Sequence, residues 1–102
     1  MTEIKNFEKK FMRKIAVKFN NVSEMKEFLF NCEINDIYFL NGDKIKDERR
    51  EYEFYNCIKF KANEYITKEI FHISKNKILL SNTRESFWEE LDFKVQYYDE
   101  II

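Results

Sequence analysis

The chain of 102 residues contains one glycine, Gly42, and no proline, although eighteen of its residues are aromatic. Loops that bind phosphate groups need several glycines, because their backbone N–H groups must approach the ligand closely. A single glycine cannot supply a P-loop or a dinucleotide-binding loop. The sequence therefore excludes these nucleotide-binding classes and leaves a small domain rich in aromatic residues.

Cysteine and histidine are equally scarce, and Cys32, Cys57 and His72 are the only three in the chain. They form no cluster at zinc or iron–sulfur spacing, so we expect no metal and no cofactor. Cys57 and His72 fall in neighbouring predicted strands, where a thiolate and a base could pair, but no residue is expected to orient the histidine. We interpret Cys32 as a core residue and His72 as a half-buried histidine. An enzyme that uses Cys57 and His72 remains the third of three functional hypotheses, after the two binding functions described below. We expect a protein that is not an enzyme.

Length and hydrophobicity favour one globular domain over residues 1–102, since 44% of the residues are hydrophobic. No apolar stretch approaches the roughly 20 residues that cross a membrane, and the polar first residues do not resemble a signal peptide. We expect a cytoplasmic protein with no membrane partner and with reduced cysteines.

The pattern of the first third predicts a helix, a strand and a second helix. Apolar residues within 2–12 have helical spacing, and residues 15–19 alternate as in a strand. Asn21 and Glu24 have the spacing of a capping box, and an apolar helical face follows over residues 22–32.

The middle of the chain predicts several strands. Residues 37–40 are apolar on both faces, as in a central strand, and Asn41-Gly42 behind them predicts a hairpin turn. The charged residues 43–51 predict a loop, an exposed strand end or a short surface helix. Alternating segments at 52–61 and 65–73, followed by a short apolar run at 78–80, predict an antiparallel meander.

The last segment predicts a helix and a closing strand. Asn82 and Glu85 have capping spacing, and Phe87, Trp88 and Leu91 then fall on the face expected to point inward. Residues 93–97 alternate as in a strand. The order of elements favours the α+β class: a two-layer sandwich in which an antiparallel sheet of about five to six strands carries two or three helices on one face. A ferredoxin-like or split β-α-β core is the leading candidate.

Nucleic-acid binding through the sheet is one functional hypothesis. Tyr55, Lys59 and Lys61, with Lys68 and His72, partly supply the aromatic and basic residues that stack on bases and contact phosphates. The glycine-bearing aromatic motif of RNA-recognition domains is absent. We therefore keep a nucleic-acid-binding or regulatory module as the alternative hypothesis.

Charge is distributed unevenly along the chain. Residues 1–20 carry a net charge of +4 and residues 83–102 a net charge of −4, whereas the whole chain carries −1. An acidic surface that includes a tyrosine suits docking onto a basic protein groove. The residues of the acidic end that we expect to point outward and to bind a partner are Glu85, Glu89, Glu90, Asp92, Tyr98, Asp99 and Glu100.

No constellation of residues requires a reaction, so a binding protein that occupies the surface of a partner is our first hypothesis. The chain is similar in type to anti-CRISPR inhibitors of phages and to toxin-immunity proteins, which are short, charged and free of motifs. This likeness implies a protein partner with a basic surface, such as a nucleic-acid-processing effector. The opposite charges of the two ends and the many aromatic residues are also compatible with a homodimer.

Overall fold

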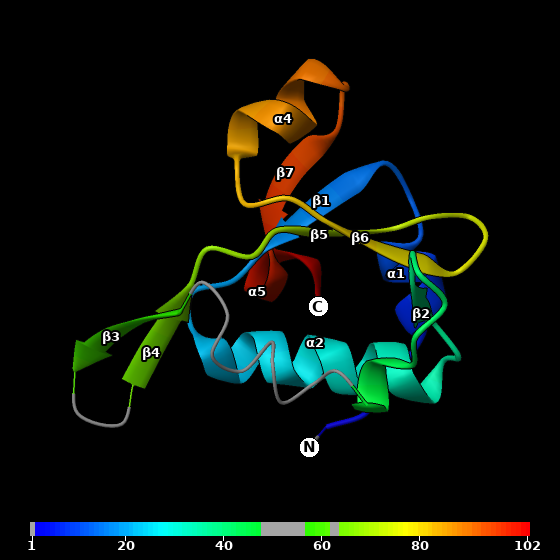
Figure 1. Ribbon diagram of the computed structural model, residues 1–102, viewed down its shortest axis with the longest axis horizontal. Helices are drawn as coiled ribbons and strands as arrows, with labels where there is room; N and C mark the ends of the chain where they lie inside the picture. Colours follow the sequence, from blue (N-terminus) through cyan, green and yellow to red (C-terminus); the bar gives the residue numbers. More distant parts are fainter. Residues whose placement is uncertain (1, 48–56, 62–63) are drawn as a thin grey trace.

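The computed structural model describes residues 2–47, 57–61 and 64–102, and for residues 57–61 and 64 it describes the backbone alone. The expected features that fall on residues 48–56 and 62–63 lie outside the described residues. Along the chain, the helices and strands are α1 (Phe7–Phe11), β1 (Ile15–Lys18), α2 (Val22–Ile34), β2 (Tyr38–Phe39), β3 (Cys57–Lys61), β4 (Glu64–Thr67), β5 (Phe71–Ile73), β6 (Ile78–Ser81), α4 (Glu85–Glu90), β7 (Lys94–Tyr97) and α5 (Tyr98–Ile101). The predicted α+β class is confirmed (Figure 1).

The main sheet has five strands in the order β2-β6-β5-β1-β7. Its central pairs are antiparallel: β1 pairs with β5 at Val17 and Phe71, and β5 pairs with β6. Both edge pairs are parallel, because β7 runs alongside β1 and β2 runs alongside β6. The expected number of strands is confirmed, whereas the expectation of an entirely antiparallel sheet is wrong at both edges.

Two helices connect parallel strands that are not neighbours in this sheet. The connection from β1 to β2 contains α2, the connection from β6 to β7 contains α4, and the two run in opposite directions along the sheet. Such connections share one hand, so two that run in opposite directions must cross on opposite faces. Figure 1 shows α2 below the sheet and α4 above it. The expectation that all helices share one face, as in a ferredoxin-like sandwich, is therefore wrong for α4.

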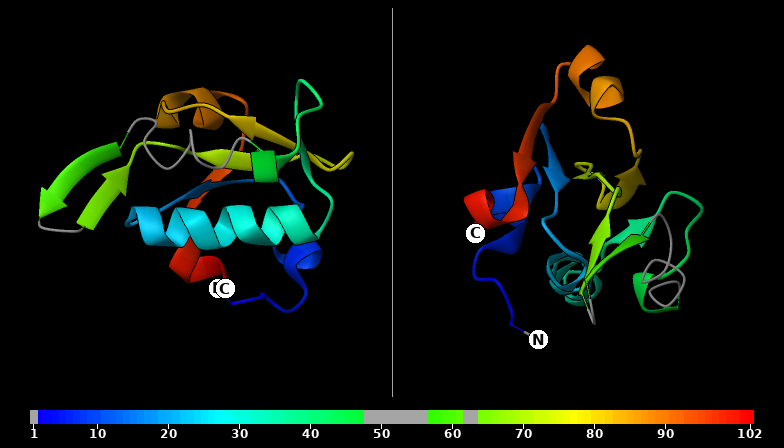
Figure 2. Two further views of the ribbon diagram at one scale, coloured as in Figure 1. Left: turned by 60° about the horizontal axis from the view of Figure 1, so that its bottom comes forward. Right: turned by 90° about the vertical axis from the view of Figure 1, so that its left-hand side faces the viewer.

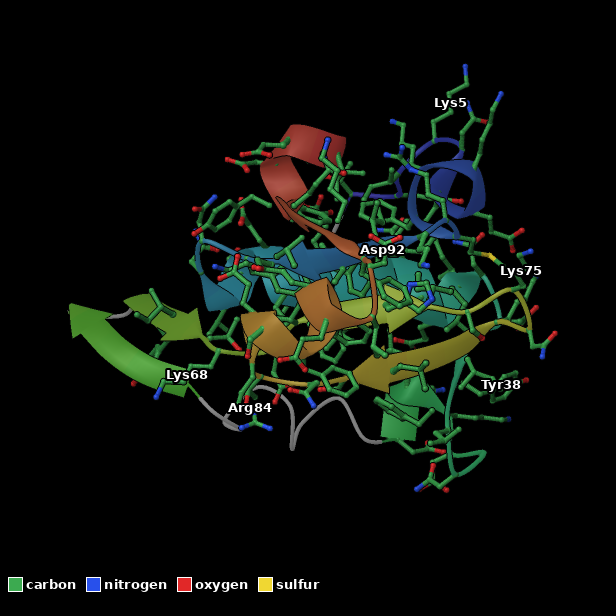
Figure 3. The ribbon with its side chains drawn as sticks, turned by 90° about the horizontal axis from the view of Figure 1, so that it is seen from above. Lys5, Tyr38, Lys68, Lys75, Arg84 and Asp92 are labelled. Atoms are coloured by element: carbon green, nitrogen blue, oxygen red, sulfur yellow. The ribbon has the colours of Figure 1, made fainter. Side chains whose placement is uncertain are left out.

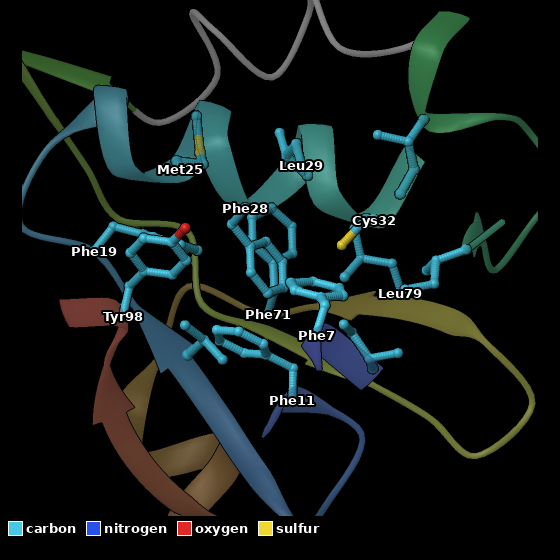
Figure 4. Packing of buried hydrophobic residues seen from close by; sticks show 14 of the residues in the cluster. Phe7, Phe11, Phe19, Met25, Phe28, Leu29, Cys32, Phe71, Leu79 and Tyr98 are labelled. Atoms are coloured by element: carbon cyan, nitrogen blue, oxygen red, sulfur yellow. The ribbon is translucent and has the colours of Figure 1, made fainter. Parts of the chain in front are cut away.

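The main core lies between the sheet and the layer formed by α1, α2 and α5, and its centre is aromatic (Figure 4). Neighbouring rings have centroids 4.7 to 6.3 Å apart in tilted, stacked and edge-on pairs. Pairs at such distances contribute about 0.5–1.5 kcal/mol each beyond the burial of their area. The buried aromatic residues of this centre are Phe7, Phe11, Phe19, Phe28, Phe71 and Tyr98.

The capping box that the sequence predicts for α2 is present with one change. The Asn21 side chain accepts the N–H of Glu24 at 2.9 Å, and the Glu24 carboxylate accepts the N–H of Asn20, rather than that of Asn21, at 2.7 Å. These bonds pair two N–H groups at the start of the helix, so that it begins at Val22 as expected. The predicted apolar face of α2 is buried, and its members are Val22, Met25, Phe28, Leu29 and Cys32.

β2 lies at the edge of the sheet and not at its centre. Phe39 is buried, but the next residue, Leu40, keeps 73% of its surface exposed. The predicted turn is confirmed, since the N–H of Gly42 donates to the Phe39 carbonyl at 2.9 Å and Gly42 has a φ of 90°. A β-bridge between Tyr38 and Lys44 follows, and residues 45–47 are helical.

The predicted meander does not form as a single sheet. β3 and β4 pair with each other in a separate two-stranded sheet, with Lys59 opposite Tyr65 and Ile58 opposite Ile66. The segment predicted as one strand at 65–73 is divided into β4 and β5 by residues 68–70, which join the two sheets. Figures 1 and 2 show this hairpin extending beyond the end of the main sheet, and β4 lies against α2.

Candidate functional site

The acidic end of the chain begins with α4, whose first residue is Glu85. The sequence places the N-cap at Asn82, but the structure places it at Arg84. The Asn82 side chain accepts the N–H of Arg84 at 2.9 Å, so it orders the turn before the helix. The predicted cap is therefore wrong by two residues, because the asparagine forms a local turn with the backbone two positions ahead.

Trp88 anchors α4 on the upper face of the sheet. Its side chain is buried, and its indole N–H donates to the Asn82 carbonyl at 3.1 Å. The ring contacts Phe87, Phe93 and His72 with centroids 5.1, 5.2 and 6.0 Å away. Trp88, Phe87 and Phe93 form a second, smaller core together with Ala16 and Ile70. The predicted inward position of Trp88 is confirmed.

A Schellman motif ends α4. The N–H of Asp92 donates to the Glu89 carbonyl and the N–H of Phe93 donates to the Trp88 carbonyl, both at 2.9 Å. Asp92 occupies the left-handed position of this motif with a φ of 65°. The motif turns Leu91 outward, where half of its surface is exposed. The prediction that Leu91 points inward is therefore wrong.

Glu89, Glu90, Leu91 and Asp92 together form a surface that we call the acidic tip. All four are exposed, and α4 projects from the side of the sheet opposite to α2 (Figure 1). Among the described residues, neither Glu89 nor Glu90 pairs with a cation, and Asp92 has a loose contact of 3.9 Å with Lys14. Figure 3 shows Asp92 on this outer side of the ribbon.

The helix itself makes the tip more negative. The C-terminal end of a helix carries a partial negative charge, and basic side chains there are stabilising. The last turn of α4 contains no basic residue, and instead Glu89 and Glu90 lie in it. The carboxylates and the helix dipole therefore add to one negative potential around Leu91.

Glu85 lies at the opposite end of α4 and is not part of the tip. Its carboxylate pairs with Lys18 of β1 at 3.1 Å, and the Lys18 Nζ lies 5.0 Å from the centre of the Tyr97 ring. Burial alone would lower the pKa of Lys18, but the hydrogen bond and the negative charge of Glu85 outweigh it and raise this pKa. The charge of Glu85 is thus largely balanced within the molecule.

Tyr98 is buried, although the sequence predicts an outward position. Its ring stacks on Phe11 at 5.8 Å, and its hydroxyl donates to the Glu27 carboxylate at 2.7 Å. Burial, together with this hydrogen bond, raises the pKa of Tyr98. Tyr98 is therefore a core residue that joins α5 to α2, and we remove it from the candidate binding surface.

Asp99 and Glu100 are exposed on α5, as predicted, but they form a separate acidic group. Asp99 accepts a hydrogen bond from the Asn20 side chain at 3.0 Å. Because α4 and α5 lie on opposite faces of the sheet, this group faces away from the tip. The structure thus brings together Glu89, Glu90 and Asp92 of the predicted site and separates the others from them.

The remaining candidate residues have structural roles or lie outside the description. Cys32 is a buried free thiol, and burial raises its pKa. His72 is half-buried, as predicted, and its Nδ1 lies 3.0 Å from the Ile15 carbonyl oxygen. Tyr55 and the side chains of Cys57, Lys59 and Lys61 lie outside the described residues, whereas Lys68 is exposed.

In the part of the chain that the structure describes, no helix is long and apolar enough to cross a membrane. No group of three or more histidine, cysteine, aspartate or glutamate side chains gathers there as a metal site would require. Comparisons of the chain with models of protein families, with curated proteins and with solved structures found no significant match.

Proposed function

We propose that this protein is a small non-enzymatic binding protein that covers a basic surface of a protein partner with its acidic tip. The observation that carries the proposal is an exposed leucine surrounded by three carboxylates at one projecting helix end. Specific interfaces combine an apolar centre, which is desolvated, with a polar rim that sets orientation. Leu91 is the proposed centre, and the carboxylates of Glu89, Glu90 and Asp92 are the proposed rim.

The stability of the protein does not account for these residues. A basic residue in the last turn of a helix is stabilising by about 0.3–1 kcal/mol, and an acidic residue there is unfavourable. The left-handed position that ends a helix is usually occupied by glycine, and here Asp92 occupies it. Three carboxylates thus stand at positions where folding favours lysine, arginine or glycine, and binding to a cationic surface supplies a reason for them.

The chemistry of the tip also suggests the class of partner. Extended basic grooves are typical of proteins that bind the phosphates of nucleic acids, since affinity for the backbone comes from lysine and arginine. An acidic tip that enters such a groove would compete with the nucleic acid. We therefore propose an inhibitor of a nucleic-acid-processing protein, of the anti-CRISPR type, with toxin immunity as the alternative use of the same surface.

A pair of charge-reversal variants tests this proposal. Glu89→Lys with Glu90→Lys changes the tip, and Asp99→Lys with Glu100→Lys makes the same change of charge on α5. Wild type and both variants are used as baits in extract of the native host, and association of the captured protein is then measured at low and high salt. We expect the tip variant to lose the partner and the α5 variant to keep it, because rim charges steer association.

Three results would contradict the proposal. The tip variant could capture the same protein with an unchanged association rate, or the α5 variant alone could lose it. Nucleic acid could copurify with both variants and dissociate steeply with salt, which would favour the nucleic-acid hypothesis instead. Loss of the partner by the tip variant cannot be attributed to unfolding, because this variant should be more stable than wild type by about 0.3–1 kcal/mol per substitution at low ionic strength.

A further inference from the structure

α1 and α5 lie side by side on one side of the molecule, below the β7 edge of the sheet (Figures 2 and 3). Phe11 of α1 stacks on Tyr98 of α5, which fixes the two short helices to each other. Met12 and Ile101 are partly buried and pack on the rim of the main core. Ile102 keeps half of its surface exposed. The junction of the two helices therefore presents aliphatic side chains to the surface.

The two halves of this surface carry opposite charges. On the α1 half, Lys5, Lys9 and Arg13 are exposed, and in the described part of the chain none of them has an acidic partner. The one acidic residue of α1, Glu8, is held by Lys77 at 2.7 Å, so it does not cancel these cations. In Figure 3 the labelled Lys5 extends away from α5.

The α5 half carries the exposed carboxylates of Asp99 and Glu100. Asp99 is bonded to the neutral Asn20 side chain, and within the described residues Glu100 has no cationic partner. We call the whole surface the α1–α5 face: a basic half on α1, an aliphatic centre and an acidic half on α5. No described contact neutralises one half with the other.

We infer that the α1–α5 face is the contact between two copies of this chain in a symmetric dimer. A two-fold axis through the aliphatic centre places the basic half of each copy on the acidic half of the other. Such an interface closes on itself and uses one surface patch twice, as isologous dimers require. The partner that best fits a face with both charge signs around an apolar centre is therefore a second copy.

This contact is distinct from the proposed partner site. The acidic tip lies on the other face of the sheet, so a dimer through α1 and α5 leaves both tips exposed. The dimer would present two tips, and each tip would contact a partner by itself, so the α5 variant is expected to keep the partner as a monomer. The inference itself does not depend on the tip having that function.

Sedimentation velocity on charge-reversed chains tests the dimer. Wild type is expected to associate with rising concentration at about 0.05 M NaCl and to dissociate at about 0.5 M, because the screening length shortens several-fold. Lys9→Glu with Arg13→Glu makes the face predominantly acidic, with Lys5 as the remaining cation of the basic half, and Asp99→Lys with Glu100→Lys replaces its acidic half by a basic one. We expect each variant alone to be monomeric and their equimolar mixture to form a dimer.

The mixture separates loss of the contact from loss of folding, since misfolded chains cannot restore each other. Glu89→Lys with Glu90→Lys is the matched control, and it should associate as wild type does. The inference is overturned if wild type stays monomeric at low salt, if the mixture stays monomeric, or if the tip variant alone abolishes association. A tip variant that loses its partner but still dimerises would support both assignments, and one that dimerises and keeps its partner would overturn the proposed function alone.

Discussion

Replacement of Trp88 by alanine tests how the acidic tip is held in place. Trp88 is the largest buried side chain of the second core, where it contacts Phe87, Phe93 and His72. Truncation of a buried tryptophan to alanine lowers the free energy of unfolding by about 3–5 kcal/mol. Loss of the hydrogen bond from the indole N–H to the Asn82 carbonyl adds about 1 kcal/mol.

The structure also sets an upper limit on this effect. α4 has six residues, and isolated helices shorter than about 12 residues are not stable in water. When Trp88 no longer anchors it, α4 can separate from the sheet while the main aromatic core stays folded. The measured loss then equals the free energy that held α4 in place, and the tip loses its defined shape at the same time.

Hydrogen exchange and urea unfolding followed by circular dichroism measure the two parts of this prediction. We expect amides of α4 to exchange much faster in Trp88→Ala, while amides of α2 keep most of their protection. Trp88→Phe is the control, because it keeps an aromatic ring in place and loses the hydrogen bond, at a cost of about 1 kcal/mol. An alanine variant within about 0.5 kcal/mol of wild type, with α4 still protected, would refute this account of the anchor.

Two further predictions concern the buried side chain of Asn31 and the half-buried side chain of His72. The Asn31 side chain accepts the N–H of Ile4 at 2.7 Å and donates to the Thr2 carbonyl at 3.0 Å. Asn31→Ala should therefore expose residues 2–5 to limited proteolysis and lower the free energy of unfolding by about 1–3 kcal/mol. Unchanged cleavage would contradict this prediction. Burial lowers the pKa of His72 below its ordinary value of 6.5, so the unfolded chain is the first to take up a proton as the pH falls. The contribution of neutral His72 to the free energy of unfolding should therefore be fully present above pH 6.5 and be lost as the pH falls from there through the lower folded-state pKa. In urea titrations at several pH values, His72→Phe should flatten this dependence.

Features set by residues close in the chain could be predicted from the sequence. The buried face and the cap of α2 depend on spacings of three and four residues, and both were predicted correctly from Asn21, Glu24 and the apolar positions that follow. The turn at Gly42 was also predicted, because glycine adopts a positive φ without steric cost and its presence alone indicates a turn. The buried Trp88 followed from its place in an apolar cluster on a helix.

Features set by the order of strands could not be predicted in the same way. An apolar run such as residues 37–40 indicates burial, but it does not show whether a second strand or a helix covers it. Here β6 pairs with one side of β2, and the buried residues Ile37 and Phe39 pack in the main core. The prediction of a central strand therefore failed although the burial of these two residues was correct.

Tyr98 shows why the acidic surface was predicted only in part. We predicted residues 93–97 as an alternating strand and Tyr98 as an outward residue of the acidic end. In the structure, Phe93 and Val95 pack in the second core, whereas Tyr98 begins α5 and enters the main core. β7 ends at Tyr97 and α5 begins at Tyr98, so the alternation of the strand no longer sets the direction of the Tyr98 side chain.

The opposite crossing of α2 and α4 explains how one acidic stretch of sequence becomes two surfaces. Because the two connections share a hand and run in opposite directions, α4 must lie on the face that α2 leaves open. β7 then forms the edge of the sheet beside β1 and leads to α5 on the side of α1. Carboxylates only a few residues apart in the chain, those of Asp92 and Asp99, are thus separated by the sheet, and each group meets a different electrostatic environment. The tip includes the negative end of α4, whereas Asp99 and Glu100 form the acidic half of the α1–α5 face. Reversal of the charges of one group should therefore disturb one proposed interaction and spare the other.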